Sequence, residues 1–392
     1  MFWVEGKEKV INSSWIRKMF EEGEKLAKIH GAENVFNFSL GNPYKEPPKK
    51  VKESVSKFME QEGIHKYMTN AGFVDVREQI AEHFNKESLT KIQGKNIIMT
   101  SGAAGGLNII LKSLLNKDEE VVVFAPYFVE YGFYAQNHGG KIKVVDTCHN
   151  NFIPRGEDLK AVLNDKTKAV IINSPNNPSG ALYSKKTIEE LATALVNWEK
   201  ESGKKVFLIS DEPYTEIVYD KHKVPKIMDC YPNTIVTTSF SKSLGLAGQR
   251  IGYVIISPNI EDSELLTDIM VFCNRTLGFV SASALWQKVA GDCIGEKVDI
   301  SDYQEKRDII FEHLTSLGFE IRKPEGTFYL FPKSPLKNDV EFAKIAMKYN
   351  ILIVPGSGFG APGYFRISYC VPTDMVKKSL DAWTKLAKEL NL

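Results

Sequence analysis

A length of 392 residues predicts two or three folding units, because one domain commonly holds roughly 150 residues. With 43% hydrophobic residues the chain can bury a large core, which excludes a disordered protein. The 50 basic residues nearly cancel the 49 acidic residues and leave a formal net charge of +1, so we expect neither a nucleic-acid partner nor a membrane partner.

The N-terminal residues and the cysteines bear on the compartment. Residues 1–7 lack the basic start and long apolar run of a signal peptide, which predicts a cytoplasmic protein. Apolar runs such as 121–125 fall far short of the ~20 residues that cross a bilayer. The 5 cysteines form no C-x-x-C pair, which favours reduced thiols. Because the 7 histidines form no H-E-x-x-H pair, we also predict no metal site.

Short apolar runs alternate with amphipathic segments as far as about residue 260. Most of these runs are apolar throughout, which indicates strands buried on both faces. The segment 184–203 has apolar residues at helical spacing, with Ser184 as a candidate N-cap and Gly203 at its end. This alternation predicts a mostly parallel α/β sheet sandwiched by helices. The predicted strands are 96–100, 120–124, 168–172, 206–210, 235–239 and 252–256.

The pattern changes in the last part of the chain, where a predicted helix at 301–317 precedes a strand-and-turn pattern at 320–331. This change indicates a separate, smaller α+β domain. The turn at 41–43 marks another boundary, and we expect the N-terminal residues to pack on the C-terminal part because chain ends often meet in space. The prediction is therefore a large domain over 45–275 and a small domain made of 1–44 and 276–392.

Ligands of open α/β sheets bind beside the carboxyl ends of the strands, so the residues that follow each predicted strand are the candidates for a binding site. The small residues 101–106 open a helical pattern after the first strand, and their free amides would suit a phosphate group. The turn-rich segment 173–180 follows another strand, and Asp211 and Tyr214 follow the next. A plain tight turn or a helix cap would explain each of these features alone.

Lys242 follows the strand at 235–239 and lies among small and apolar residues. Lysines are mostly solvated surface residues, but desolvation here would lower the pKa of Lys242 and make its neutral amine available as a nucleophile. Together the four strand ends provide a phosphate cradle, an amide, a carboxylate with a phenol, and an amine near an arginine. Pyridoxal phosphate requires this set of groups.

Three motifs are similar to those of the class I/II aminotransferases, pyridoxal phosphate enzymes of fold type I, and the chain most resembles their aspartate aminotransferase-like members. The motifs are 239–242 followed by Arg250, the asparagine-proline turn 176–180, and the segment 211–214, and they occur in the family's order. The resemblance covers nearly the whole chain. It implies that Lys242 binds the cofactor covalently and acts as the catalytic acid and base.

The resemblance also implies how the cofactor is held. Asp211 would face the pyridine nitrogen, Asn177 and Tyr214 would bind the ring oxygen O3′, and Phe128 would stack on the ring. The phosphate would be bound by the backbone amides of Ala103 and Ala104, the Ser239 hydroxyl, the Arg250 guanidinium and Tyr67 of a neighbouring subunit. This last contact implies a homodimer with shared active sites.

Arg366 resembles the arginine that binds the α-carboxylate of the substrate, with Gly41 and Asn177 beside it, although a surface ion pair is the alternative for Arg366. Ala104 departs from the family pattern, because relatives often have a hydroxyl or a lysine there. No motif assigns an arginine to a distal carboxylate, for which Arg17 and Arg275 are weak candidates.

The resemblance implies a ping-pong aminotransferase that moves an amino group from an L-amino acid, with aspartate or an aromatic amino acid favoured, to a 2-oxo acid such as 2-oxoglutarate. A pyridoxal phosphate-dependent carbon–sulfur β-lyase or a synthase of the same fold is the alternative. A non-catalytic ligand-binding member of the fold is a further alternative. Such a protein need not keep Lys242, Asp211, Asn177 and Arg250 together, so the presence of all four argues against it. A Rossmann dehydrogenase is disfavoured because no G-x-G-x-x-G motif follows a predicted strand.

Overall fold

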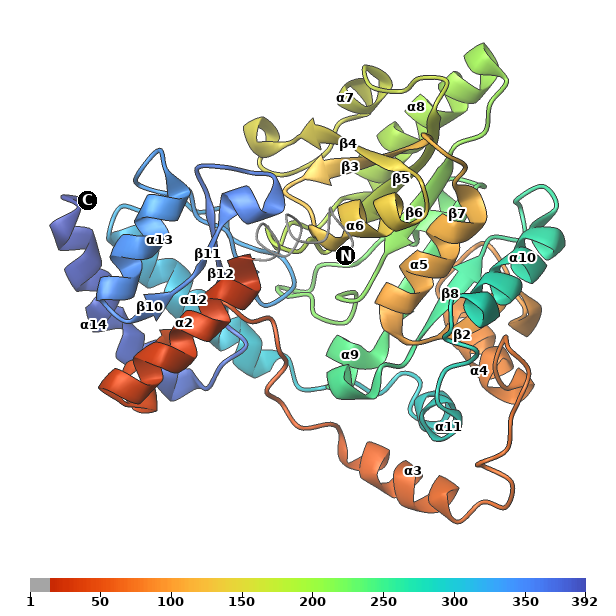
Figure 1. Ribbon diagram of the computed structural model, residues 1–392, viewed down its shortest axis with the longest axis horizontal. Helices are drawn as coiled ribbons and strands as arrows, with labels where there is room; N and C mark the ends of the chain where they lie inside the picture. The colour runs from red at the N-terminus through yellow and green to blue at the C-terminus, as the bar shows by residue number, and fades with distance from the viewer. Residues whose placement is uncertain (1–14) are drawn as a thin grey trace, which may run out of the picture.

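The computed structural model describes residues 15–392 and contains a central seven-stranded sheet (Figure 1). Its strand order is β2-β8-β7-β6-β5-β3-β4. Only β8 runs antiparallel to its neighbours β2 and β7, so the predicted mostly parallel α/β sheet is confirmed. The strands are β2 (Ile97–Thr100), β3 (Glu120–Ala125), β4 (Lys141–Asp146), β5 (Thr167–Asn173), β6 (Phe207–Asp211), β7 (Thr234–Ser239) and β8 (Gly252–Ile256).

Helices cover both faces of this sheet. Successive side chains of a strand point to opposite faces, so a strand that is apolar throughout must be covered on both sides. In β3, Val121 and Val123 pack with one group of helices, and Val122 and Phe124 pack on the other side. The covering helices are α3 (Lys49–Met59), α4 (Val74–Asn85), α5 (Gly102–Leu114), α6 (Glu130–Asn137), α7 (Gly156–Lys160), α8 (Lys185–Ser202), α9 (Phe240–Ser243), α10 (Ser263–Thr276) and α11 (Ala284–Asp292).

The predicted helix at 184–203 corresponds to α8, and its two ends form as the sequence indicates. The Ser184 hydroxyl accepts a hydrogen bond from the Thr187 amide at 3.1 Å, and Gly203 ends the helix with a φ of 70°. Strand β4 is absent from the predicted strands. It lies at the edge of the sheet, where its lysines alternate with apolar residues and Lys141 is exposed, so it lacks an apolar run.

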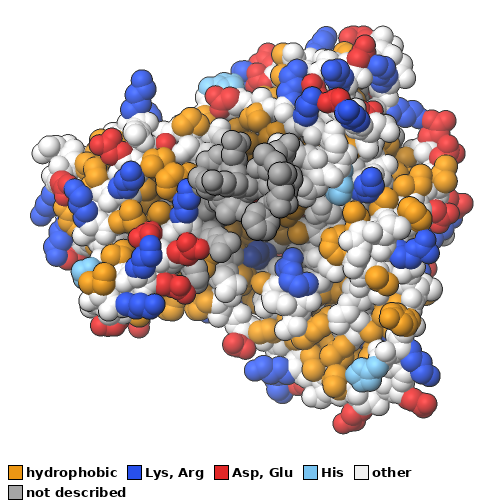
Figure 2. Space-filling view, viewed as in Figure 1, with side chains coloured by type: hydrophobic (Ala, Val, Ile, Leu, Met, Phe, Trp, Pro, Cys, Tyr) orange, Lys and Arg blue, Asp and Glu red, His pale blue; other side chains and the backbone are white. Residues whose placement is uncertain are grey.

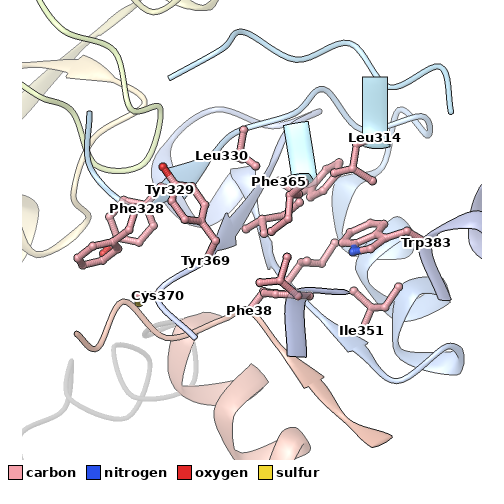
Figure 3. Close-up of a cluster of buried hydrophobic side chains, with 14 of the residues drawn as sticks. Phe38, Leu314, Phe328, Tyr329, Leu330, Ile351, Phe365, Tyr369, Cys370 and Trp383 are labelled. Atoms are coloured by element: carbon pink, nitrogen blue, oxygen red, sulfur yellow. The ribbon is translucent and has the colours of Figure 1, made fainter. Parts of the chain in front are cut away.

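The C-terminal part forms a second core that is rich in aromatic side chains (Figure 3). Phe365 and Trp383 are stacked there with ring centroids 6.2 Å apart. The strands β9 (Tyr329–Leu330) and β12 (Phe365–Ser368) contribute to this core, and β12 pairs antiparallel with both β9 and β11 (Val354–Pro355). The helices α12 (Ser301–Ser316), α13 (Asp339–Lys348) and α14 (Thr373–Glu389) pack around it. The predicted strand pattern at 320–331 is strand only at β9, because turns and extended segments make up the rest.

The N-terminal segment joins this C-terminal part. Helix α2 (Trp15–His30) precedes β1 (Phe36–Asn37), which pairs in parallel with β10 (Ile351–Leu352). Phe38 is fully buried in the aromatic core. Residues from the two ends of the described chain therefore share one core.

The division into domains at 44/45 and 275/276 stays a proposal. The pairing of β1 with β10 supports a small domain made from both ends. Helix α11 packs on α3 and α4 beside the large sheet, which supports a boundary after α11 rather than after residue 275.

Charges of both signs are interspersed over the face of the molecule that Figure 2 shows. Within residues 15–392, no helix has the length and apolar character needed to cross a membrane. The same part of the chain contains no group of three or more potential metal-binding side chains, and its five cysteines are free.

Candidate active site

The carboxyl ends of β2, β5, β6 and β7 meet at a pocket of about 470 Å³. All the predicted site residues except Tyr67 line it, although they come from segments far apart in the sequence. Tyr67 is 97% exposed and lies outside this pocket. The predicted residues that line the pocket are Gly41, Ala103, Ala104, Phe128, Asn177, Asp211, Tyr214, Ser239, Lys242, Arg250 and Arg366.

Lys242 lies in the short helix α9, directly after β7. Its Nζ donates a hydrogen bond to the Gly41 carbonyl oxygen at 2.8 Å. Burial lowers the pKa of Lys242 to about 8; the nearby Arg366 and Arg250 guanidinium groups contribute to this shift, and Cys370 partly opposes it. Because a carbonyl oxygen does not neutralise the ammonium, the amine gives up its proton more readily than an exposed lysine does.

Asp211 is the last residue of β6, and it is buried at the carboxyl end of that strand. Its Oδ2 accepts a hydrogen bond from the Tyr131 hydroxyl at 2.5 Å, while its Oδ1 is buried without a hydrogen-bond partner in the described structure. Burial raises the pKa of Asp211 to about 6, and the Tyr131 hydrogen bond partly opposes this rise. The free oxygen is therefore available to accept a hydrogen bond from a donor bound in the pocket.

Arg366 lies beside Asn177, although the two residues are 189 positions apart in the sequence. The Arg366 Nη1 donates to Asn177 Oδ1 at 3.0 Å, and Nη2 donates to the Ser39 carbonyl oxygen at 2.7 Å. Its guanidinium lies over the Tyr329 ring at 4.5 Å, and its Nε is buried without a partner within residues 15–392. Burial lowers the pKa of Arg366. The alternative of a surface ion pair for Arg366 is wrong, because the side chain is only 1% exposed and its guanidinium bonds to Asn177 and to the Ser39 carbonyl oxygen.

The hydroxyl of Tyr214 lies 3.1 Å from that of Tyr329, and both tyrosines line the pocket. Burial raises the pKa of Tyr214 well above its usual value. The phenol is therefore a neutral hydrogen-bond donor at physiological pH. Phe128 forms another part of the wall and contacts Tyr131 edge to face, with ring centroids 5.6 Å apart.

The start of α5 and Arg250 form the anion-binding end of the pocket. Ala103 and Ala104 lie in the first turn of α5, where backbone amides have no partner within the helix. A Cβ on Gly102 would lie 2.9 Å from the Arg250 Nη2, so the missing side chain at Gly102 keeps this region open. Arg250 is held by a hydrogen bond from Nη1 to the Ala247 carbonyl oxygen at 3.0 Å.

Several residues of the pocket were missed by sequence reasoning. Tyr329 falls inside the predicted strand pattern at 320–331, where nothing marks it as a site residue. Tyr134 and Glu130 lie on α6, and Asn173 lies at the end of β5. Only Asn173 carried a usable signal, because it directly follows the apolar run of a predicted strand.

The family model of class I and II aminotransferases matches residues 33–382. The chain belongs to this aminotransferase family. The aspartate aminotransferase of Pyrococcus horikoshii is 28% identical and is aligned over 97% of this chain and 95% of its own. The aromatic-amino-acid aminotransferase 2 of Thermococcus litoralis is 30% identical, with 98% of each chain aligned.

Solved structures of aminotransferases share this fold over the whole chain. An amino transferase from Eubacterium rectale is 39% identical, with a TM-score of 0.96 and 100% of both chains covered. The aspartate aminotransferase of Thermotoga maritima is 29% identical, with a TM-score of 0.86 and a coverage of 98% of this chain and 99% of that one. The predicted family, fold and enzyme class are confirmed.

Aminotransferases of this family depend on pyridoxal phosphate, and the pocket fits this cofactor. The unpartnered Asp211 Oδ1 matches a pyridinium N–H donor, and the open start of α5 beside Arg250 matches a phosphate group. Ala104 provides no side-chain donor to that phosphate, as expected.

The two weak candidates for binding a distal carboxylate receive no support from the pocket. Arg275 lies outside it, in the last turn of α10, where its guanidinium contacts the Phe272 ring at 5.3 Å. The side chain of Arg17 lies outside the described residues.

Proposed function

We propose that this aminotransferase moves an amino group from an L-amino acid to a 2-oxo acid by a ping-pong mechanism. The observation that carries the proposal is the convergence of the Lys242 amine, the free Asp211 Oδ1 and the buried Arg366 guanidinium on one pocket. These three groups provide a base, an acceptor for a ring N–H and a carboxylate-binding site.

Pyridoxal phosphate, when bound, supplies an electron sink for the negative charge that develops at the substrate Cα. Asp211 would hold its pyridine nitrogen, and Tyr214 and Asn177 would hold O3′. Phe128 would cover the ring. The amides of Ala103 and Ala104, the Ser239 hydroxyl and Arg250 would hold the phosphate. These roles agree with the chemistry of each group at the pocket wall.

The amine of Lys242 accepts the proton that leaves the substrate Cα. A pKa of about 8 leaves a useful fraction of this amine neutral at physiological pH. The Gly41 carbonyl oxygen accepts a hydrogen bond from Nζ and so orients it toward the pocket. The same lysine provides the covalent attachment of the cofactor.

Arg366 binds the α-carboxylate of the substrate, with the support of Asn177 and the backbone at Gly41. A buried guanidinium without a carboxylate partner is costly, and a substrate carboxylate would compensate this charge. The planar guanidinium can form two parallel hydrogen bonds to a carboxylate, which fixes the orientation of the substrate Cα.

The names of the relatives suggest aspartate and aromatic amino acids as the first donors to test, with 2-oxoglutarate as acceptor. We expect the purified holoenzyme to lose its visible cofactor absorption on addition of a donor alone and to recover it on addition of the oxo acid. Release of pyruvate and ammonia from a β-substituted amino acid without an oxo acid would instead indicate a lyase. The measurement is a spectrum of each half-reaction.

We further propose a homodimer, in which the phosphate of each site is contacted by Tyr67 of the partner subunit. Tyr67 is almost fully exposed in the single chain, which is unusual for a large aromatic side chain without a partner. Helix α10 also exposes large apolar side chains, including Leu265 at 59% and Phe272 at 55%.

The cytoplasmic location stays a prediction.

Replacement of Tyr67 by phenylalanine is expected to weaken cofactor binding about tenfold, because it removes one charge-assisted hydrogen bond and leaves the ring in place. The measurement is the cofactor dissociation constant, with the oligomeric state followed by sedimentation. Tyr349→Phe is the control, since that hydroxyl bonds to Glu389 far from the site. A monomeric wild-type protein with full activity would contradict the shared site.

A further inference from the structure

Tyr329 lines the active-site pocket, and the proposed mechanism gives it no role. It lies on β9, opposite Ser368 in the antiparallel pairing of β9 with β12. Arg366 is two residues from Ser368, so its side chain is on the same face of the sheet as Tyr329. Because Tyr329 is only 2% exposed within a single chain, the chain itself, rather than solvent or a second subunit, provides its surroundings.

The Tyr329 hydroxyl lies 3.1 Å from the Tyr214 hydroxyl, and the two rings are edge to face with centroids 5.8 Å apart. Either phenol can donate the hydrogen bond. When Tyr214 donates its proton to the cofactor oxygen O3′, its own oxygen is free to accept a hydrogen bond from Tyr329. Hydrogen bonds that form a chain in a buried site strengthen one another. The Tyr329 hydroxyl therefore makes Tyr214 a stronger donor to O3′.

The ring of Tyr329 supports the arginine that would bind the substrate carboxylate. Its centroid lies 4.5 Å from the Arg366 guanidinium carbon, and Phe359 places a second ring at 4.7 Å from the same carbon. Contacts between a cation and an aromatic ring are strongest where water is excluded, and Arg366 is buried. A guanidinium held by two rings keeps the orientation that a two-point contact with a carboxylate requires.

The hydroxyl of Tyr329 also lies against the backbone of Gly41. A Cβ built on Gly41 would overlap with this hydroxyl, so the missing side chain allows the two segments to meet. The carbonyl oxygen of Gly41 accepts the hydrogen bond from Lys242. Tyr329 therefore contacts three parts of the site, which are Tyr214, Arg366 and the segment that orients Lys242.

The chain places Tyr329 with a strained turn at Thr327. The φ of Thr327 is 64°, which is unfavourable for a β-branched residue. The Thr327 amide donates to the Ile217 carbonyl oxygen at 2.9 Å, and its carbonyl oxygen accepts from the Tyr369 hydroxyl at 3.2 Å. Its hydroxyl oxygen accepts from the Tyr329 amide at 3.2 Å. Such conformations persist only where the surrounding structure determines them, and they cluster at functional sites.

We propose that Tyr329 is a positioning residue with two separable contributions: its hydroxyl strengthens the hydrogen bond from Tyr214 to O3′, and its ring holds Arg366 for the substrate carboxylate. The inference rests on the proposed transamination at this pocket and adds a residue to it. The two contributions affect different measurements, because the first acts on the cofactor without a substrate and the second acts on the substrate.

The first experiment compares wild-type holoenzyme with Tyr329→Phe, which removes the hydroxyl and keeps the ring. Tyr214 stabilises negative charge on O3′, so a weaker donor should shift the pH midpoint of the visible cofactor absorption upward by about half a unit. The groups that act on Tyr329, namely Arg366, Cys370 and Tyr214, are the same in both proteins. We expect kcat to fall about fivefold, whereas KM for the amino acid should change less than about twofold.

The second variant, Tyr329→Leu, removes the ring as well. Because Arg366 then loses one of its two aromatic supports, KM for the amino acid should rise about tenfold above that of Tyr329→Phe. The matched control is Tyr231→Phe, which removes the hydroxyl of another buried tyrosine, bonded to the Val206 carbonyl oxygen at 2.7 Å outside the pocket. It should leave the midpoint and both kinetic constants unchanged.

An unchanged midpoint in Tyr329→Phe, or equal KM values in Tyr329→Phe and Tyr329→Leu, would overturn the inference. A purely structural role would lower the thermal stability of the variants without moving the midpoint, so thermal unfolding is measured beside it. The midpoint requires no substrate and is measurable whether or not transamination occurs. Absence of transamination with every donor in the wild-type protein would instead reject the proposed function itself.

Discussion

Lys242→Ala is expected to lower kcat for transamination by about 10⁴-fold, since the variant loses the group that moves the proton from the substrate Cα. The variant should also lose covalent attachment of the cofactor. Two measurements check this prediction: steady-state kinetics with an aromatic donor, and the mass of the chain after borohydride reduction. Reduction should add a cofactor-sized mass to the wild-type chain and none to the variant.

A second substitution separates the charge of Lys242 from its ability to lose a proton. Lys242→Arg keeps the cation but cannot supply a neutral amine, so it should be as inactive as Lys242→Ala. Lys112→Ala, at an exposed position on α5, is the control and should retain wild-type activity. Transamination at the wild-type rate by either Lys242 variant would refute the assigned role.

Asp211→Asn is expected to lower kcat by about 10³-fold, comparable to the loss of one well-placed electrostatic group in an active site. Asparagine preserves the size of the side chain, but it cannot stabilise a protonated ring nitrogen by its charge. The variant should still bind the cofactor, because the phosphate contacts and Lys242 are unchanged. The measurements are kcat and the cofactor dissociation constant.

Glu212→Gln is the matched control for Asp211. Glu212 is the adjacent carboxylate, its pKa is raised by burial to about 7, and it accepts a hydrogen bond from the Ser210 hydroxyl at 2.7 Å. It does not line the pocket, so its replacement should leave kcat within a few-fold of wild type. Equal losses in the two variants would show that burial of a carboxylate at this sheet edge, rather than its position in the site, determines the effect.

Much of the site was predictable because its polar residues directly follow apolar strands. Asp211 ends β6 and Lys242 follows β7 by three residues, so buried runs in the sequence indicate where these side chains lie. The carboxyl ends of parallel strands meet at one edge of a sheet, which brings such residues together in any fold of this class. The motif order then identified the family, and the family model confirms it.

Other residues of the site could not be predicted in this way. Tyr329 lies on β9, outside the large sheet, and Glu130 begins α6 and does not directly follow a strand, since β3 ends at Ala125. Strand β4 was missed because an exposed edge strand has no continuous apolar pattern. In each case the local sequence resembles ordinary surface or core sequence, and only packing against distant segments gives the residue its place.

The sequence by itself determined the family, the mostly parallel sheet and the chemical groups that the site contains, because these follow from local patterns of burial and from motifs within a few residues. The tertiary structure alone decided which groups are left without partners. It placed Arg366 against Asn177 and left Asp211 Oδ1 unpaired. The physical reason is that desolvation and pairing depend on neighbours from distant parts of the sequence, and these neighbours determine the charges that line the pocket.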